Sequence, residues 1–204
     1  PGVRLEIDKA VEGSKEEDGE ILAYGENIML GYHNLPDEKK KSINEKGGLR
    51  TGDLGHLDSD GYLFITGRIK EQFKLENGRF VSPAPLEESL KLSAYIDHVM
   101  LYGFNRPHNV ALIVAAMSAV EKYAEGLGIS GKNENILNEP SIKQLFQEQL
   151  ESFGKDFKSF ERPRNFALLS EEWSIDNGLL TPTLKLKRSV VEEQFMSLIE
   201  SLYS

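Results

Sequence analysis

Hydrophobic and polar residues alternate over short segments in the first third of the chain. Val3-Arg4-Leu5-Glu6-Ile7 alternates with a period of two, and Glu20-Ile21-Leu22-Ala23-Tyr24 follows the turn dipeptide Asp18-Gly19. Both patterns predict strands, the first of them half-buried. Further expected elements are a short strand that ends at Gly31-Tyr32-His33-Asn34, an exposed helix over 36–46 and a hairpin at Asp60-Gly61. So few strands predict a small β-subdomain that packs against something larger.

The pattern changes after residue 70 to a mixture of strands and helices. The apolar run Val110–Met117 predicts a buried strand, and Ile142, Leu145, Phe146, Leu150 and Phe153 share one helical face. We also expect strands at 98–104 and 166–169 and a loop at 128–138. Two helices are expected at 82–92 and 118–127, with Ser82 and Ser118 as their N-caps. A last helix is expected to begin at the capping box Ser189-x-x-Glu192. That helix is expected to bury Val191, Phe195, Leu198, Ile199 and Leu202. The predicted fold class is α+β: a small β-subdomain followed by a compact α+β module.

Composition narrows the classes of function. The 204 residues include 33 acidic and 24 basic ones, for a net charge of -9, which argues against a nucleic-acid binder because phosphate contacts need clustered cations. The absence of cysteine excludes disulfides, thiol nucleophiles and thiolate zinc sites. The longest apolar run is far shorter than the roughly 20 residues that span a bilayer. No signal peptide is visible and position 1 is not Met, so we expect a fragment of a longer protein.

Single polar residues suggest chemistry only weakly. Asp53 follows Thr51-Gly52 and can accept hydroxyl hydrogen bonds from a sugar, but it also fits an ordinary turn aspartate. Arg68 can bind phosphate or ribose oxygens, or pair on the surface with Glu71. Lys185 can bridge a carboxylate and a phosphate, or be a solvated lysine in a basic cluster. The chain's four histidines, which show no metal-ligand spacing, are His33, His56, His98 and His108.

Four motifs in order are more specific than any single residue. They are Arg50-Thr51-Gly52-Asp53-Leu54, then Asp60-Gly61-Tyr62 with Gly67-Arg68-x-Lys70, then Gly78 with Pro83 and Glu87, and finally Thr181-x-Thr183-x-Lys185-x-x-Arg188. Together they resemble the C-terminal third of an adenylate-forming enzyme, the superfamily of acyl-CoA synthetases, luciferases and peptide-synthetase adenylation domains. The resemblance covers nearly the whole chain.

Details of the last motif resemble the long-chain fatty-acid–CoA ligase branch. Thr183-Leu184 precedes Lys185 at the position where the wider superfamily usually has Ser-Gly. The segment Glu161-Arg162-Pro163, followed by Phe166-Ala167-Leu168-Leu169, is also similar to the long-chain branch. One departure is Pro85, where most of the superfamily has Glu. The long-chain branch is variable there, so we interpret Pro85 as a feature of the branch.

The resemblance implies a role for five residues. Asp53 would bind the ribose hydroxyls of ATP and of the acyl-adenylate, and Arg68 would support the same ribose. Lys70 would be the hinge between two domains. Gly78 would lie where the pantetheine arm of coenzyme A passes, because a side chain there would block it. Lys185 would contact the carboxylate and the phosphate in the adenylation step.

The resemblance also implies domains, substrates and location. Residues 1–68 would be the incomplete β-subdomain of the large AMP-binding domain, and 69–204 the mobile C-terminal lid domain. The full-length ATP-dependent acyl-CoA synthetase would use ATP, Mg²⁺, a fatty acid and coenzyme A, with the metal ligand in its N-terminal remainder. We expect the isolated chain to be inactive. We expect a cytoplasmic location, with peripheral association at the inner face of the membrane left open. Transfer to a carrier protein and a non-catalytic binding module are the alternative functions.

Overall fold

The computed structural model describes residues 2–14 and 17–204, and the chain divides into two compact units. The first unit runs to Phe73 and includes Arg79–Ala84, and the second contains Lys74–Gly78 and Pro85–Ser204. The two domains expected from the sequence, 1–68 and 69–204, stay a prediction. The first of them includes residues 1, 15 and 16, which lie outside the described residues.

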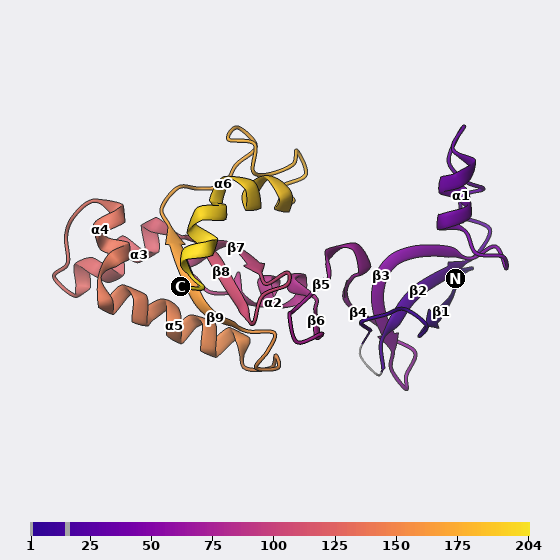
Figure 1. Ribbon diagram of the computed structural model, residues 1–204, viewed down its shortest axis with the longest axis horizontal. Helices are drawn as coiled ribbons and strands as arrows, with labels where there is room; N and C mark the ends of the chain where they lie inside the picture. The colour runs from indigo at the N-terminus through magenta and orange to yellow at the C-terminus, as the bar shows by residue number, and fades with distance from the viewer. Residues whose placement is uncertain (1, 15–16) are drawn as a thin grey trace. The chain divides into compact units, whose positions relative to one another are not determined.

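An antiparallel sheet forms the first unit (Figure 1). Its strands lie in chain order, β1 Arg4–Asp8, β2 Gly19–Tyr24, β3 Leu49–Leu57 and β4 Leu63–Arg68. Two shorter elements of this unit are α1 Pro36–Ser42 and the 3-10 turn η1 Ile69–Glu71. A two-stranded sheet consists of β5 Phe73–Lys74, whose Lys74 is assigned to the second unit, and β6 Phe80–Val81. The strands expected at 3–7 and 20–24 are confirmed as β1 and β2, and the buried apolar residues of this sheet include Ile21 and Leu22 of β2 and Leu54 of β3.

Two predictions for the first unit are wrong. Residues 25–34, all of them described, form turns and bends instead of a strand, and Leu30 is 90% exposed. Asn34 has a φ of 55°, which breaks an extended segment. The exposed helix ends at Ser42, short of Lys46, because Ile43 is extended and pairs with Leu49.

The second unit is a three-stranded sheet with helices on both faces (Figure 1). Its strands are β7 Ile96–Tyr102, β8 Asn109–Ala115 and β9 Pro163–Leu169, with β8 in the centre, antiparallel to β7 and parallel to β9. The helices are α2 Pro83–Leu90, α3 Met117–Gly126, α4 Asn133–Asn138, α5 Pro140–Gly154 and α6 Arg188–Ser201.

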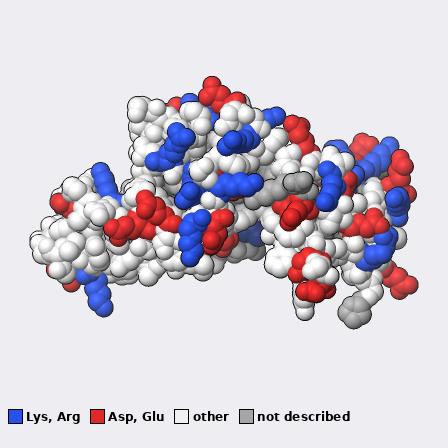
Figure 2. Space-filling view, turned by 90° about the horizontal axis from the view of Figure 1, so that it is seen from below, with Lys and Arg blue, Asp and Glu red and all other residues white. Residues whose placement is uncertain are grey.

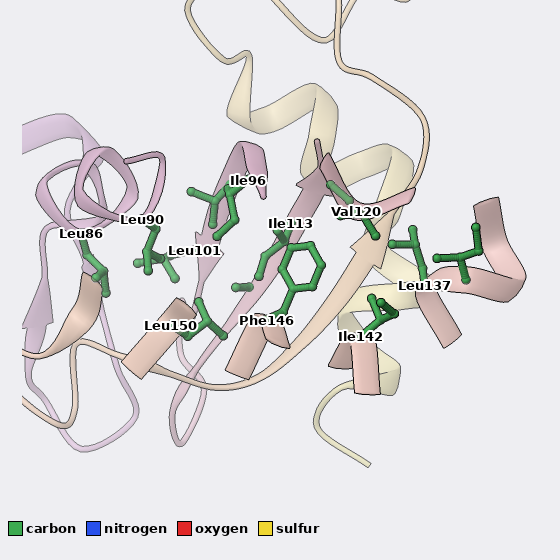
Figure 3. Packing of buried hydrophobic residues seen from close by; sticks show 14 of the residues in the cluster. Leu86, Leu90, Ile96, Leu101, Ile113, Val120, Leu137, Ile142, Phe146 and Leu150 are labelled. Atoms are coloured by element: carbon green, nitrogen blue, oxygen red, sulfur yellow. The ribbon is translucent and has the colours of Figure 1, made fainter. Parts of the chain in front are cut away.

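Alternate residues of β8 pack into two hydrophobic clusters. Ala111, Ile113 and Ala115 contribute to the cluster that α2, α3, α4 and α5 cover, and Figure 3 shows Ile113 beside Phe146 within it. Val110, Leu112 and Val114 contribute to the other cluster, with Trp173 and the apolar residues of α6. The strand is buried along its whole length and apolar from Val110 to Ala115, which confirms the predicted buried strand, although it ends at Ala115 and Met117 begins α3.

The expected face of α5 is also confirmed, since Ile142, Leu145, Phe146 and Leu150 are buried and Phe153 packs against them. Residues Val191 and Ile199 of α6 are buried, and the other expected positions of that helix pack against the second cluster. Both assignments rest on apolar residues that recur with a period of 3.6 residues, because a helix that packs one face against a sheet needs apolar residues at that spacing.

Three other predictions for the second unit are wrong. A helix, α4, occupies part of the expected loop, because Ile136 and Leu137 are buried within an otherwise polar stretch. The N-cap of α3 is Ala116, and that of α6 is Lys187, so Ser118 and Ser189 lie inside the first turns. The start of α6 follows from the preceding segment, where the Lys187 N–H donates to the carbonyl oxygen of Leu179 at 2.9 Å.

Candidate functional site

Asp53 and Arg68 form an ion pair in the first unit. They are directly opposite each other on β3 and β4, and Arg68 Nε donates to Asp53 Oδ1 at 2.6 Å. The side chain of Asp53 is 29% exposed and that of Arg68 is 50% exposed. A carboxylate has about four acceptor positions, so Asp53 keeps capacity for two hydroxyl donors while it holds the arginine. The structure thus brings together the two residues expected at the ribose.

The residues before Asp53 hold its backbone in place. Thr51 Oγ1 donates to the carbonyl oxygen of Ile21 at 2.8 Å and accepts the Asp53 N–H at 3.1 Å. Gly52 has a φ of 74°, a conformation that favours glycine, and its N–H donates to Glu20 Oε1 at 3.2 Å. Arg50 Nη1 pairs with Glu20 Oε2 at 2.5 Å. These hydrogen bonds connect β3 to β2 and position Asp53.

Glu20 was not identified from the sequence. It is only 5% exposed although it is charged, and both of its oxygens accept hydrogen bonds from the Arg50-Thr51-Gly52 segment. A buried carboxylate of this kind is retained where it is paired and hydrogen-bonded. A signal for it was available, because Glu20 is an acidic residue at the start of an otherwise apolar strand.

Lys70 is exposed and lies in the 3-10 turn η1 between β4 and β5. The residues on both sides of this turn are extended, with φ and ψ of -128° and 137° at Arg68 and of -67° and 144° at Gln72. The Gln72 N–H donates to the carbonyl oxygen of Arg68 at 3.1 Å. A helical turn of three residues between extended residues concentrates a change of backbone direction at Lys70, which suits a hinge.

Gly78 closes a tight turn in the second unit. Its N–H donates to the carbonyl oxygen of Leu75 at 2.9 Å, and its φ is 83°. A Cβ built on Gly78 would lie 3.9 Å from Lys74 Cε, an ordinary contact. The turn therefore requires glycine for its backbone conformation, and the space next to Gly78 within its own unit is open.

Lys185 is exposed at the end of a short hairpin loop in the second unit. Leu180 and Leu186 pair as an antiparallel bridge, and the Thr181 N–H donates to the carbonyl oxygen of Lys185 at 2.8 Å. In return, the Lys185 N–H donates to Thr181 Oγ1 at 3.0 Å. Leu184 has a φ of 59°, unusual for a residue with a branched side chain, so the loop is held in a strained conformation.

A buried ion pair anchors this loop to the rest of the second unit. Arg188 Nη2 pairs with Glu87 Oε2, and Glu87 Oε1 accepts the Leu101 N–H at 2.7 Å. Glu87 is 7% exposed and belongs to α2, whereas Arg188 begins α6 directly after the loop. The sequence motifs contained both residues, but their pairing over 101 positions is a finding of the structure.

The described residues carry no recognisable metal site and no membrane-spanning helix. Among residues 2–14 and 17–204, no group of three or more His, Asp or Glu side chains is arranged to hold a metal ion. No helix in the same part of the chain is long and apolar enough to cross a membrane. Figure 2 shows Lys and Arg side chains interspersed with Asp and Glu on the displayed face, so that face carries no extended basic surface.

Comparison with known proteins shows where the chain belongs. The family described as AMP-binding enzyme C-terminal domain matches residues 70–204. Long-chain-fatty-acid–CoA ligase 1 of Cavia porcellus is 34% identical over 92% of this chain and 27% of its own length. The chain thus spans little more than a quarter of that curated relative.

Solved structures agree on the fold. The adenylation domain of a carboxylate reductase from Mycobacterium chelonae is 25% identical, with a TM-score of 0.80 over 100% of this chain and 31% of that one. The A-PCP didomain of carboxylic acid reductase from Segniliparus rugosus, in complex with AMP, has a TM-score of 0.77 at 23% identity, over 100% of this chain and 28% of that one. Because the family match covers well over half of its residues, the chain belongs to the family of AMP-binding enzyme C-terminal domains.

Proposed function

We propose that this chain is the C-terminal part of a ligase that activates a long-chain fatty acid with ATP. The ligase forms an acyl-adenylate and pyrophosphate, and then transfers the acyl group to coenzyme A with release of AMP. The observation that carries this assignment is the Lys185 hairpin, which presents one exposed cation on a strained loop braced by the Glu87–Arg188 pair. The names of the curated relatives support the choice of fatty acid and coenzyme A.

In the first half-reaction, a carboxylate oxygen attacks the α-phosphate and pyrophosphate leaves. Both reactants are anions, so the ammonium group of Lys185 placed between them lowers the barrier electrostatically. Holding the reactants in place also removes part of the entropic cost of bringing them together. Asp53 would accept the ribose hydroxyls, with Arg68 fixing the orientation of its carboxylate through the 2.6 Å hydrogen bond.

In the second half-reaction, the thiol of coenzyme A attacks the carbonyl carbon of the adenylate and AMP leaves. We propose that the C-terminal domain rotates about Lys70 between the two steps, which withdraws Lys185 and brings in the Gly78 turn. The open space beside Gly78 suits the passage of a narrow pantetheine arm. The described residues offer no cluster for Mg²⁺, so no step is assigned to the metal within this chain.

A second candidate is favoured by the fold likeness to the A-PCP didomain, a protein with a carrier domain attached. On this alternative, the acyl group passes to a carrier protein in place of coenzyme A. A non-catalytic binding module is the third candidate. It would apply if the longer protein that contains this chain had no phosphate-binding loop.

The acceptor decides between the first two candidates. The longer protein would be incubated with ATP, Mg²⁺ and labelled palmitate, and then offered either coenzyme A or a carrier protein bearing a phosphopantetheine thiol. We expect palmitoyl-CoA to form and the carrier to stay unlabelled. Label on the carrier alone would support the second candidate, and absence of any acyl-adenylate would support the binding module.

A further inference from the structure

The Gly78 turn is attached to the loop between β7 and β8. The Glu76 N–H donates to the carbonyl oxygen of Arg106 at 3.0 Å, and the Asn105 N–H donates to the carbonyl oxygen of Lys74 at 2.9 Å. This reciprocal pair of backbone hydrogen bonds joins Lys74–Gly78 to the β7–β8 loop over a separation of about thirty positions. The position of the turn therefore depends on the position of that loop.

The last turn of α6 and the residues that follow it contact the same loop. Arg106 Nη2 pairs with Glu200 Oε1, and the Arg106 guanidinium carbon lies 5.0 Å from the centre of the Tyr203 ring. The Tyr203 hydroxyl lies 3.1 Å from the carbonyl oxygens of both Tyr102 and His108, so it can donate to either end of the loop. We call these three residues, Arg106, Glu200 and Tyr203, the C-terminal clamp.

The β7–β8 loop has a backbone conformation that needs stabilising contacts, and the C-terminal clamp supplies such contacts. Asn105 has a φ of 51° in the middle of the loop, a conformation that asparagine tolerates but that other contacts must stabilise. Burial raises the pKa of Tyr203 above its ordinary value, and its hydroxyl, like that of any tyrosine, carries its proton at neutral pH and can donate a hydrogen bond. The Arg106–Glu200 pair is partly exposed, at 31% and 46%, so it contributes most as part of the cluster.

We propose that Arg106, Glu200 and Tyr203 are positioning residues for the coenzyme A step. They would act through the β7–β8 loop, which holds the Gly78 turn by its two backbone hydrogen bonds. This role rests on the proposed function, in which the Gly78 turn faces the pantetheine arm. Lys185 is braced by different contacts, those of Glu87 and Arg188, so the adenylation step should not depend on the clamp.

The two half-reactions separate this role from general stability. In the longer protein, Tyr203→Phe and Arg106→Ala would be assayed for ATP–pyrophosphate exchange and for thioester formation from supplied acyl-adenylate at varied coenzyme A. We expect KM for coenzyme A to rise about five- to tenfold, as for the loss of one or two positioning hydrogen bonds. Pyrophosphate exchange should stay at the wild-type rate.

Asn165→Ala is a matched control at the same end of the molecule. Asn165 Nδ2 donates to the carbonyl oxygen of Leu202 at 3.1 Å, so its loss also loosens the C-terminus but leaves the loop contacts in place. We expect this variant to behave as wild type in both half-reactions. A KM for coenzyme A raised as much by Asn165→Ala as by Tyr203→Phe would overturn the role of the clamp.

A charge swap tests whether Arg106 acts on the loop or directly on a phosphate of coenzyme A. The double variant Arg106→Glu/Glu200→Arg keeps the ion pair with reversed polarity, so a positioning role predicts that it restores KM for coenzyme A relative to either single variant. A swap that stays as defective as Arg106→Glu alone would contradict positioning and favour direct contact. Hydrogen exchange at the Glu76 amide should be faster in Tyr203→Phe and normal in Asn165→Ala.

The remaining outcomes are also decisive. A wild-type protein that forms no thioester from supplied acyl-adenylate overturns the proposed function, and the role of the clamp with it. An active wild-type protein with an unchanged KM for coenzyme A in Tyr203→Phe overturns the clamp alone. Equal losses in both half-reactions would show a structural effect and reject a specific role in the second step.

Discussion

Lys185 and Lys187 are two positions apart, yet the structure places them differently. Lys185 is exposed at the end of the hairpin loop, where its N–H bonds Thr181 Oγ1. Lys187 is half-buried, donates its N–H to the carbonyl oxygen of Leu179 and is the N-cap of α6. Lys185 is thus the more exposed of the two residues and lies on the loop itself, which supports the choice of Lys185 over its neighbour.

Replacement of these lysines tests that choice in the longer protein. Lys185→Ala should slow adenylation by about 100-fold or more, because one placed charge is commonly worth about 3 kcal/mol in a transition state. Thioester formation from supplied acyl-adenylate should change little, and Lys187→Ala should be mild in both assays. Pyrophosphate exchange measures the first step. If Lys187→Ala proves the more damaging change, the motif has been assigned two positions out of place.

At the scale of the residue, sequence reasoning found the motif positions but not the contacts that hold them. Asp53 and Arg68 were identified by resemblance, but their pairing depends on the register of β3 against β4, which no local pattern specifies. Glu20 was missed because a single acidic residue in a strand looks like a solvated one until its burial is known. Gly78 was expected for space, and the structure adds its positive φ as a local reason.

An ion pair between a buried carboxylate and a partly exposed guanidinium joins the helices α2 and α6. Glu87 is largely buried and accepts the β7 backbone N–H of Leu101 as well as the Arg188 guanidinium. The pair lies at the base of the Lys185 loop, since Arg188 follows the loop directly and begins α6. Its loss should therefore disturb both the packing of two elements and the position of the loop.

Arg188→Ala should be strongly destabilising, because it leaves the buried Glu87 carboxylate without the guanidinium. We expect the free energy of unfolding to fall by about 3 kcal/mol, the usual cost of removing one member of a buried pair. Urea unfolding of the chain, followed by circular dichroism, measures it. The double variant Glu87→Gln/Arg188→Met should recover most of the loss. A single variant within about 0.5 kcal/mol of wild type would mean that the pair is effectively solvated.

At the scale of the element, periodicity was reliable where burial was one-sided or complete. The face of α5 and the run of β8 were predicted because packing imposes period and composition on them. Short polar segments were not predicted correctly. Helix α4 was missed because only two of its residues, Ile136 and Leu137, are apolar and buried. Both capping serines lie two residues after the observed N-caps, since the start of each helix depends on tertiary contacts of the preceding segment.

The two units of the molecule differ in how much core they contain. The second unit covers both faces of its sheet with its own helices. The described part of the first unit buries few large side chains, among them Ile21, Leu22 and Leu54. A β-subdomain of this size normally needs a neighbour to cover its apolar surface. Stability should therefore be distributed unevenly along the chain.

Two measurements on the isolated chain test this view. Residues 71–204 should fold alone, and their amides should exchange more slowly than those of residues 1–67. The chain should form no acyl-adenylate from ATP, Mg²⁺ and palmitate, because the phosphate loop and acyl pocket belong to the rest of the proposed ligase. Equal protection in both parts would contradict the first statement, and appreciable acyl-adenylate would contradict the second.

Rotation of the C-terminal domain about Lys70 is the central claim at the scale of the whole molecule. Lys70 occupies a 3-10 turn, whose usual φ is about -50 to -70°. Proline fixes φ near -65°, a value that suits residue 70 in such a turn, but it disfavours the helical conformation that Ile69 has at the start of the turn and removes an N–H donor. Alanine at the same position leaves φ free. The comparison of Lys70→Pro with Lys70→Ala therefore isolates backbone rotation from the loss of the lysine side chain.

The most direct test measures both half-reactions of Lys70→Pro in the longer protein. If the adenylation conformation has the φ that proline imposes, ATP–pyrophosphate exchange should persist while transfer of the acyl group to coenzyme A fails, and Lys70→Ala should retain both steps. If Lys70 is an ordinary surface residue, proline should impair both steps alike or neither. A Lys70→Pro enzyme that forms the thioester at the normal rate would contradict the hinge.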